Sequence, residues 1–351
     1  MRKEVVLVAM VVVVVVSWVV AAGGEAAAAA AVVVDPAWRF PSARLRDAYV
    51  ALQTWKQTAI FSDPKNLTAD WVGPAVCAYT GVFCAPLPGA GGAPGEVAVA
   101  GVDLNHGDIA GYLPAELGLL TDLALLHLNS NRFCGLVPDA LRRLRRLHEL
   151  DLSNNRLVGA FPAAVLDLPA LSLGNMSATL NEILLINNGL DSCVPPEVGL
   201  LREVTVFDVS FNSLAGPLPP EVAGMRKVEQ LDVAHNRLAG AVPEAVCDLP
   251  RLKNFTFSYN YFTGEPPSCA RVVPAADGDR RNCLPNRPYQ RTPRQCAAFY
   301  AAPPVDCAAF QCKPFVPSPP LLPPPPPAYP GPLPPVYPVP YASPPPPPLY
   351  R

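Results

Sequence analysis

Hydrophobic residues recur at a fixed interval through the middle of the chain, in the frame LxxLxLxxNxLxGxxP. The frame is clearest in LHELDLSNNRLVGAFP at 147–162 and in VEQLDVAHNRLAGAVP at 228–243. Its LxL stretch places two apolar residues on one side of a short strand and the residue between them on the other. Repetition of such a unit predicts a solenoid of stacked coils with a function in binding. Seven frames begin near Val99, Leu123, Leu147, Leu180, Val204, Val228 and Leu252.

An asparagine ends the strand of nearly every frame. Its side-chain amide can donate and accept hydrogen bonds, so we expect it to satisfy backbone groups of its own coil and of the neighbouring coil. The first frame has Gly107 at this position. The spacing is 24 residues except for one step of 33, through Asn131, Asn155, Asn188, Asn212, Asn236 and Asn260.

The long step, from Asn155 to Asn188, marks an irregular segment at 163–179. There LSLGNMSAT places Gly174, Met176 and Thr179 where Leu, Leu and Asn belong. A nine-residue loop on the outer face would explain the difference, because solenoids tolerate insertions there. The alternative is a sequence from which whole repeats are missing.

Residues 35–97 precede the repeats and should cover the open apolar end of the solenoid. Leu45, Tyr49, Leu52 and Trp55 have near-helical spacing, which predicts a short amphipathic helix within 43–59. A disulfide between Cys77 and Cys84 would close a small loop after it.

The repeats, at 98–270, give way to a cysteine-rich segment at 271–312 and a proline-rich tail at 313–351. In the tail, 20 of 39 residues are proline, which favours an extended, disordered polyproline II chain without a core. Cys247 and Cys269 should tie down the last coil, whereas Cys134 and Cys193 have no obvious partner. The pairing within the cysteine-rich segment stays open among three possibilities for Cys283, Cys296, Cys307 and Cys312.

The N-terminus has the pattern of a secretory signal peptide at 1–22, with two positive charges and an apolar run from Val5 to Val16. An uncleaved membrane anchor is the alternative, since the apolar stretch is just long enough to span a bilayer. Secretion favours disulfides over thiol chemistry and makes three Asn-x-Ser/Thr sites candidates for N-glycosylation. These sites are Asn66, Asn175 and Asn254.

Charge and motif content exclude several classes of function. The net charge is −2 and no basic run alternates with aromatic residues, so nucleic acid is not an expected partner. No nucleophile, base and orienting group occur together, and no phosphate-binding loop or metal-ligand spacing is present, so we expect no catalytic residues, cofactor or metal. The histidines at 106, 127, 148 and 235 follow the repeat instead.

Acidic residues gather on the exposed side of the predicted strands. The position between the two apolar residues of LxL would form one column on the concave face, and four aspartates there would attract a basic ligand. Aspartate is also simply common at this position in such repeats. The candidate ligand-binding residues are Asp103, His127, Asp151, Asp208 and Asp232, with Glu149, Glu182 and Glu229 beside them.

Together, these parts resemble the plant leucine-rich repeat extensins of the cell wall. The resemblance covers nearly the whole mature chain and is carried by specific phrases, among them DLNHGDIAGYLPAELGLL at 103–120, NFTFSYNYFTGEPPSC at 254–269 and RRNCLP at 280–285. It implies an α/β-type solenoid, a right-handed superhelix of plant-specific leucine-rich repeats with an N-terminal cap. Two features depart from the family: seven repeats are fewer than its members have, which favours missing repeats at the irregular segment, and the tail is short.

The resemblance also implies a function. Such proteins are secreted to the cell wall, bind basic peptides of the rapid alkalinization factor type through their repeats, and govern wall assembly and polarised growth. Wall polysaccharides including pectin, wall proteins, malectin-like receptor kinases and a second copy in a homodimer are the other implied partners. Tail anchorage would involve hydroxylation and glycosylation at Ser318, Ser343, Pro344, Pro345, Pro346, Pro347 and Pro348. A purely structural wall glycoprotein and an inhibitor of a wall-degrading hydrolase are the alternatives.

Overall fold

The computed structural model describes residues 32–88, 94–166, 180–275, 277–303, 305 and 307, which all belong to one compact unit, Ala27–Lys313. The predicted signal peptide at 1–22, the tail at 313–351 and the irregular segment from 167 on lie outside these residues. So do Asn175, Cys312 and the candidate modification sites of the tail. Within the described ranges, no helix combines the length and apolar character needed to cross a membrane.

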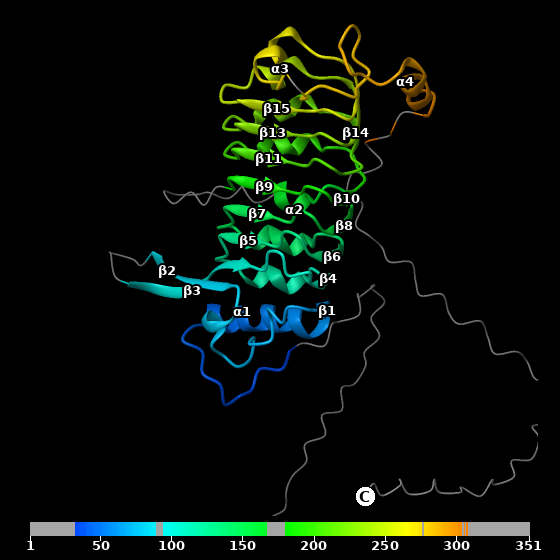
Figure 1. Cartoon of the computed structure of the whole chain (residues 1–351). Helices are drawn as coiled ribbons and strands as arrows, with labels where there is room; N and C mark the ends of the chain where they lie inside the picture. The colour runs from blue at the N-terminus through cyan, green and yellow to red at the C-terminus, as the bar shows by residue number, and fades with distance from the viewer. Residues whose placement is uncertain are drawn as a thin grey trace, which may run out of the picture. The chain divides into compact units, whose positions relative to one another are not determined.

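The N-terminal cap is built on the predicted helix. Helix α1 (Ala43–Thr54) starts where the hydroxyl of Ser42 accepts a hydrogen bond from the Leu45 N–H at 3.2 Å, and it continues into a π-helical turn, η1 (Trp55–Ala59). Trp55 is fully buried, with its ring centroid 6.2 Å from that of Trp71 and 5.5 Å from that of Phe133. The cap therefore supplies apolar surface to the first coils, at the blue end of Figure 1.

One face of the solenoid is an eight-stranded sheet. Its seven parallel strands match the seven predicted frames, and β2 pairs antiparallel with the first of them at one edge (Figure 1). The strands are β2 (Val82–Pro88), β3 (Pro94–Asp103), β5 (Leu125–His127), β7 (Glu149–Asp151), β9 (Glu182–Leu184), β11 (Val206–Asp208), β13 (Gln230–Asp232) and β15 (Asn254–Thr256).

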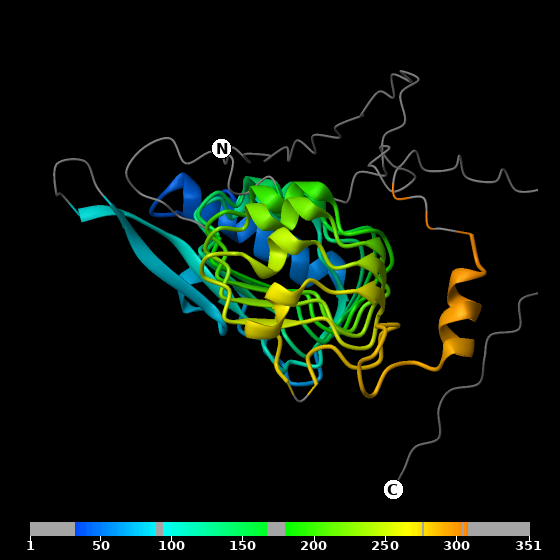
Figure 2. The ribbon, with the colours of Figure 1, turned by 90° about the horizontal axis from the view of Figure 1, so that it is seen from above.

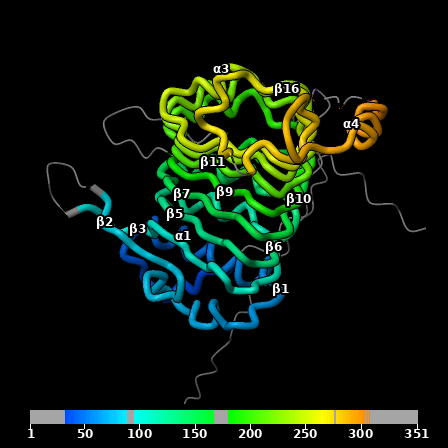
Figure 3. The backbone as a smooth tube through the Cα atoms, turned by 45° about the horizontal axis from the view of Figure 1, so that its top comes forward, coloured from blue at the N-terminus to red at the C-terminus, as the bar shows by residue number. Residues whose placement is uncertain are grey.

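Each coil then turns through a second, lateral strand and a short helical turn before the next coil begins, which Figures 2 and 3 show as stacked rings. The lateral strands form two sheets: β1 (Ile60–Ser62), β4 (Ala110–Tyr112), β6 (Arg132–Gly135), β8 (Arg156–Gly159) and β10 (Gly189–Leu190), followed by β12 (Ala215–Pro217), β14 (Arg237–Ala241) and β16 (Tyr261–Gly264). The outer turns are η4 (Ala115–Leu119), η5 (Asp139–Arg143), α2 (Ala163–Leu166), η7 (Pro196–Leu200), η8 (Pro220–Gly224), α3 (Glu244–Cys247) and η9 (Pro267–Arg271). A further turn, η2 (Val76–Ala78), lies in the cap.

The predicted asparagine ladder is confirmed. Asn236 is representative: its Nδ2 donates to the carbonyl of Val209 in the preceding coil at 3.0 Å and to that of Val233 in its own coil at 3.1 Å. Its Oδ1 accepts the Leu214 N–H at 2.9 Å. Each asparagine thus joins two coils and satisfies backbone groups that the turn buries.

The ladder also crosses the irregular segment. Strand β7 pairs directly with β9, and β8 with β10, although 167–179 lie between them in sequence. Asn188 donates to the Leu152 carbonyl at 3.0 Å and accepts the Leu157 N–H at 3.0 Å. The coils before and after the segment are therefore stacked as ordinary neighbours.

The ladder does not stop at residue 270, where the sequence predicts the end of the repeats. Asn282 is fully buried, donates to the Phe257 carbonyl at 3.1 Å and accepts the Phe262 N–H at 3.1 Å. It follows Asn260 by 22 residues rather than 24 and is itself followed by Leu284, as in the NxL of the frame. The first part of the cysteine-rich segment is therefore an eighth, incomplete coil.

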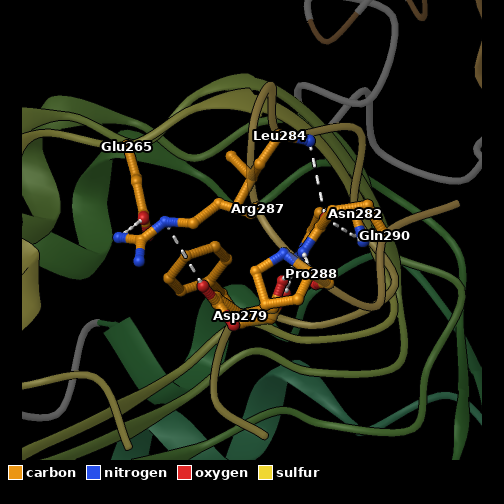
Figure 4. Close-up of polar contacts among 8 residues, drawn as sticks. Glu265, Asp279, Asn282, Leu284, Arg287, Pro288 and Gln290 are labelled. Atoms are coloured by element: carbon orange, nitrogen blue, oxygen red, sulfur yellow. Dashed lines mark hydrogen bonds and ion pairs between the residues drawn. The ribbon is translucent and has the colours of Figure 1, made fainter. Parts of the chain in front are cut away.

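Polar contacts close the end of this coil (Figure 4). The guanidinium of Arg287 pairs with the buried carboxylate of Glu265 and lies 3.8 Å from that of Asp279. The side chain of Gln290 accepts the Asn282 N–H at 3.0 Å and donates to the Asp279 carbonyl at 3.2 Å. Side chains of the cysteine-rich segment thus cover the last coil where no further repeat follows.

Four disulfides are formed among the described cysteines. Cys77–Cys84 and Cys247–Cys269 are the pairs expected from the sequence. Cys283–Cys296 also forms, but the expectation that the four cysteines of the cysteine-rich segment pair among themselves is wrong, because Cys307 bonds outside that segment. Cys193, for which the sequence indicates no partner, bonds to Cys307 across 114 residues. Cys134 is an exposed free cysteine.

Candidate functional site

The solvent side of the eight-stranded sheet, called the strand face below, carries the predicted column of side chains. Parallel pairing places one residue of each strand beside its counterpart on the next, and all of them are partly exposed. The column contains Asp103, His127, Asp151, Leu184, Asp208, Asp232 and Thr256. A second column two residues earlier contains Gly101, Leu125, Glu149, Glu182, Val206, Gln230 and Asn254.

The four aspartates of the column have a structural role that sequence reasoning did not identify. In each, Oδ1 accepts the backbone N–H of the residue two positions later, at distances from 2.8 to 3.0 Å. This bond stabilises the turn that leaves the strand, as aspartate commonly does in turns. One carboxylate oxygen of each aspartate is therefore committed to the fold, and Oδ2 of Asp151 also accepts from Nδ2 of Asn129 at 3.4 Å. The second oxygens are the atoms that would act on a ligand. The residues are Asp103, Asp151, Asp208 and Asp232.

The candidate glutamates differ from the aspartates because two of them are already paired. The Oε2 of Glu149 lies 3.1 Å from Nε2 of His127, and that of Glu229 lies 2.5 Å from Nζ of Lys253. Glu229 also precedes strand β13 rather than lying in it. Of the acidic candidates on the face, the aspartates and Glu182 are therefore the ones best placed to attract a ligand.

Burial raises the pKa of two neighbouring aspartates. The pKa of Asp208 is raised by desolvation, although its hydrogen bonds to Ser210 act in the opposite direction. The pKa of Asp232 is raised to about 7, first by desolvation and then by the negative charge of Asp208. This end of the column is therefore less negative in acid than at neutral pH, and a bound cation would favour the charged form.

Replacing Asp232 with Asn should stabilise the protein at neutral pH. Because the folded-state pKa lies above the unfolded value, the carboxyl's contribution is most favourable in acid and is lost as pH rises from about 4 to about 7. Asparagine keeps the acceptor for the Ala234 N–H but stays neutral, so the variant's free energy of unfolding should exceed wild type by roughly 1–3 kcal/mol above pH 7.

Thermal unfolding between pH 4.5 and 8 measures this difference. Asp139→Asn is the control, because that side chain is 78% exposed. Its melting temperature should differ from that of wild type by the same amount at every pH in the range. If the melting temperatures of wild type and Asp232→Asn differed by the same amount at every pH, the raised pKa of Asp232 would be contradicted.

A third column, along the edge of the strand face, was not foreseen. The residue before each ladder position has a left-handed backbone, with φ between 51° and 58°: His106, Ser130, Asn154, Asn187, Phe211, His235 and Tyr259. The last three rings are stacked, with centroids 3.9 and 4.0 Å apart. Bulky residues are uncommon in this conformation. The sequence does carry a signal for this column, because its residues occupy the same position in every frame.

The C-terminal end of this column is basic rather than acidic. Tyr259, Arg280, Arg281, Tyr289 and Gln290 line a pocket of about 250 Å³. Burial, and then the nearby charge of Arg291, lower the pKa of His235, so this histidine stays neutral at ordinary pH. The surface beside the carboxylate column therefore changes from polar to aromatic and then to cationic.

The remaining candidates lie as follows. Asn66 is exposed in a turn of the cap, and Asn254 is exposed on β15, where a glycan would cover the C-terminal end of the strand face. Within the described part of the chain, no group of three or more His, Cys, Asp or Glu side chains is arranged to hold a metal ion.

Comparison with known proteins identifies similar chains. The family model described as Leucine Rich Repeat matches residues 146–168. Leucine-rich repeat extensin-like protein 6 of Arabidopsis thaliana is 54% identical over 334 residues, covering 77% of this chain and 70% of the relative. Protein 7 of that series is 45% identical over 250 residues (52% and 56%), and protein 2 is 64% identical over 97 residues (28% and 12%).

Among solved structures, the fold is similar to that of PEPR1 in its crystal structure with AtPEP1. The TM-score is 0.55 at 21% identity, over 69% of this chain and 32% of the other. This likeness supports the solenoid fold itself.

Proposed function

Because this chain belongs to the leucine-rich repeat extensin family, we propose that it is a secreted, non-enzymatic protein of the plant cell wall that binds basic signalling peptides of the rapid alkalinization factor type. The strand face would bind the peptide, and the proline-rich tail would hold the protein in the wall. Through both, the protein would regulate wall assembly, cell shape and polarised growth. The segment at 1–22 would direct secretion.

The in-register aspartate column carries this proposal. Asp208 and Asp232 lie on neighbouring strands, where burial raises the pKa of both carboxyls by disfavouring their charged forms. A basic side chain placed against them would supply the missing counter-charge. PEPR1, whose solenoid has a similar fold, was crystallised with AtPEP1, which is consistent with a binding role for the solenoid proposed here.

The test is a titration of the full chain with a basic, cysteine-containing peptide of this type, for wild type and for Asp151→Asn/Asp208→Asn/Asp232→Asn. Asparagine retains the turn hydrogen bonds, so the triple variant should fold while its affinity falls at least tenfold, which corresponds to about 1.4 kcal/mol. Binding should also tighten between pH 5.5 and 8 in wild type, as Asp232 loses its proton.

The matched control removes three carboxylates from the outer turns instead. Glu197→Gln/Glu221→Gln/Glu244→Gln changes the net charge by the same amount at exposed positions outside the strand face, so its affinity should stay near wild type. Equal loss in both triple variants would indicate a general charge effect. Absence of micromolar binding by folded wild type would refute peptide binding.

A purely structural role is the second candidate, and the turn hydrogen bonds of the aspartates favour it. If those carboxylates serve only the fold, the strand-face variant will bind every tested peptide as wild type does. The repeats would then act as a spacer for the tail, and wall attachment alone would carry the function.

A further inference from the structure

An apolar groove lies away from the strand face, between helix α4 (Pro293–Tyr300) and the lateral strands β12 and β14. Figure 2 shows this orange helix standing beside the stacked coils. The groove has a volume of about 590 Å³. Its lining includes Gly216, Pro217, Ala239 and Gly240 from the strands, and Ala298, Phe299, Tyr300, Pro303 and Val305 from α4 and the residues after it.

One disulfide within helix α4 and another after it attach this segment to the coils. Cys296 within α4 bonds to Cys283 of the eighth coil, and Cys307 beyond it bonds to Cys193 of an earlier coil. The ring of Phe299 stacks on that of Tyr261 at 3.6 Å, and the hydroxyl of Tyr300 donates to the Tyr261 carbonyl at 2.5 Å. None of the helix residues is buried, although these contacts fix its position.

The two walls have complementary chemistry. The strand wall is made of glycine, proline and alanine, and a side-chain carbon added at Gly240 would meet no atom within 4 Å. The helix wall presents Phe299 and the half-exposed ring of Tyr300. Arg237, also in the lining and exposed, adds a hydrogen-bond donor at the groove.

A polyproline II chain fits this combination. Proline-rich segments dock in grooves lined by aromatic side chains, and they arrive already extended, so little conformational entropy is lost. Their carbonyls make no internal hydrogen bonds and can accept from a donor such as Arg237. Proline has no backbone N–H, so prolines bound along the apolar part of the groove need no hydrogen-bond acceptor there.

The sequence supplies such a segment on every copy of the protein. Residues 314–331 contain ten prolines, with Leu321 and Leu322 among them and Tyr329 near the end. We propose that the groove beside α4 binds the proline-rich segment of a second copy of this chain. Because groove and segment are different surfaces, the contact is heterologous and need not close, so it would link copies into open chains.

Self-association of the full chain tests the proposal. Ala298 lines the groove, whereas the adjacent Ala297 is also exposed on the same helix and does not line it. Arginine at 298 should fill the groove with charge and bulk, while arginine at 297 should leave it open. Sedimentation across a hundredfold concentration range should show mass rising for wild type and Ala297→Arg, but at least tenfold weaker association for Ala298→Arg.

A synthetic, unmodified peptide of residues 314–331 provides a second measurement. In excess it should dissociate wild-type assemblies and bind Ala297→Arg at least tenfold more tightly than Ala298→Arg. Association of equal strength in both variants would overturn the proposal. A mass that does not depend on concentration would also overturn it, because the groove would then be filled by the chain's own segment. Both variants should bind the basic peptide with the same affinity. Failure of the groove proposal can therefore be distinguished from failure of peptide binding at the strand face.

Discussion

Replacing Asn260 with alanine is expected to destabilise the C-terminal coils by about 1–3 kcal/mol. The side chain is fully buried, and its Nδ2 donates to the carbonyls of Val233 at 2.9 Å and Phe257 at 3.1 Å. Its Oδ1 accepts the Leu238 N–H at 2.9 Å. Alanine would leave the Leu238 N–H buried without its acceptor, and one unsatisfied buried group costs about 1–3 kcal/mol. The carbonyls of Val233 and Phe257 would each lose one of two donors and keep the amide of Asn236 or Asn282.

The loss should be local, because coils of a solenoid interact mainly with their neighbours. Hydrogen exchange followed along the chain should show faster exchange around β13, β15 and the eighth coil, with the N-terminal coils little changed. Gln230→Ala is the control, since that amide is exposed on the strand face and should cost less than about 0.5 kcal/mol. Exchange that rises equally in all coils would mean that the solenoid unfolds as one unit.

Sequence reasoning placed the strands and the ladder because both follow from local chemistry repeated at one period. The alternation around Asp151 and Asp232 fixes which side chains leave the core, and the parallel register then brings the column together. What it could not supply was the conformation of the turn after the strand. The bond from Asp232 to the N–H of Ala234 and the left-handed backbone of Phe211 depend on that turn.

Contacts between distant coils could not be predicted from the sequence for a different reason. Cys193 and Cys307 are 114 residues apart, and only the stacking of the coils and the path of α4 determine that they meet. An added side chain at Gly216 would come within 2.6 Å of the Cys307 sulfur, so a glycine of the frame also makes room for the bridge. Asn282 had a visible signal in its NxL sequence, but its 22-residue spacing and the surrounding cysteines obscured it.

The two ends of the solenoid are closed in different ways. At the C-terminus, ion pairs and disulfides in a segment with few apolar residues cover the eighth coil (Figure 4). At the N-terminus, an amphipathic helix and large aromatic side chains do so. The N-terminal end therefore depends on packing, where removing a single side chain should have a large effect.

Trp55→Ala is expected to destabilise the N-terminal cap by about 3–5 kcal/mol, the usual loss for a fully buried aromatic side chain. The indole packs near Trp71 and Phe133, and its Nε1–H donates to the Tyr112 carbonyl at 3.1 Å, so the change would remove both a large apolar surface and a bond to the first lateral strands. Hydrogen exchange should rise in α1, β4 and β6 before it rises in β13 and β15.

Phe61→Ala is the matched control for this change. That ring is 67% exposed in the neighbouring strand β1 and contacts Tyr112 at 5.7 Å, so its removal should cost less than about 1 kcal/mol. Equal destabilisation by the two variants would show that the cap is held by its surface contacts. A large loss confined to Trp55→Ala would instead establish that the first coils depend on the apolar cover that α1 and η1 provide, as expected for an array whose terminal coil cannot bury its own open face.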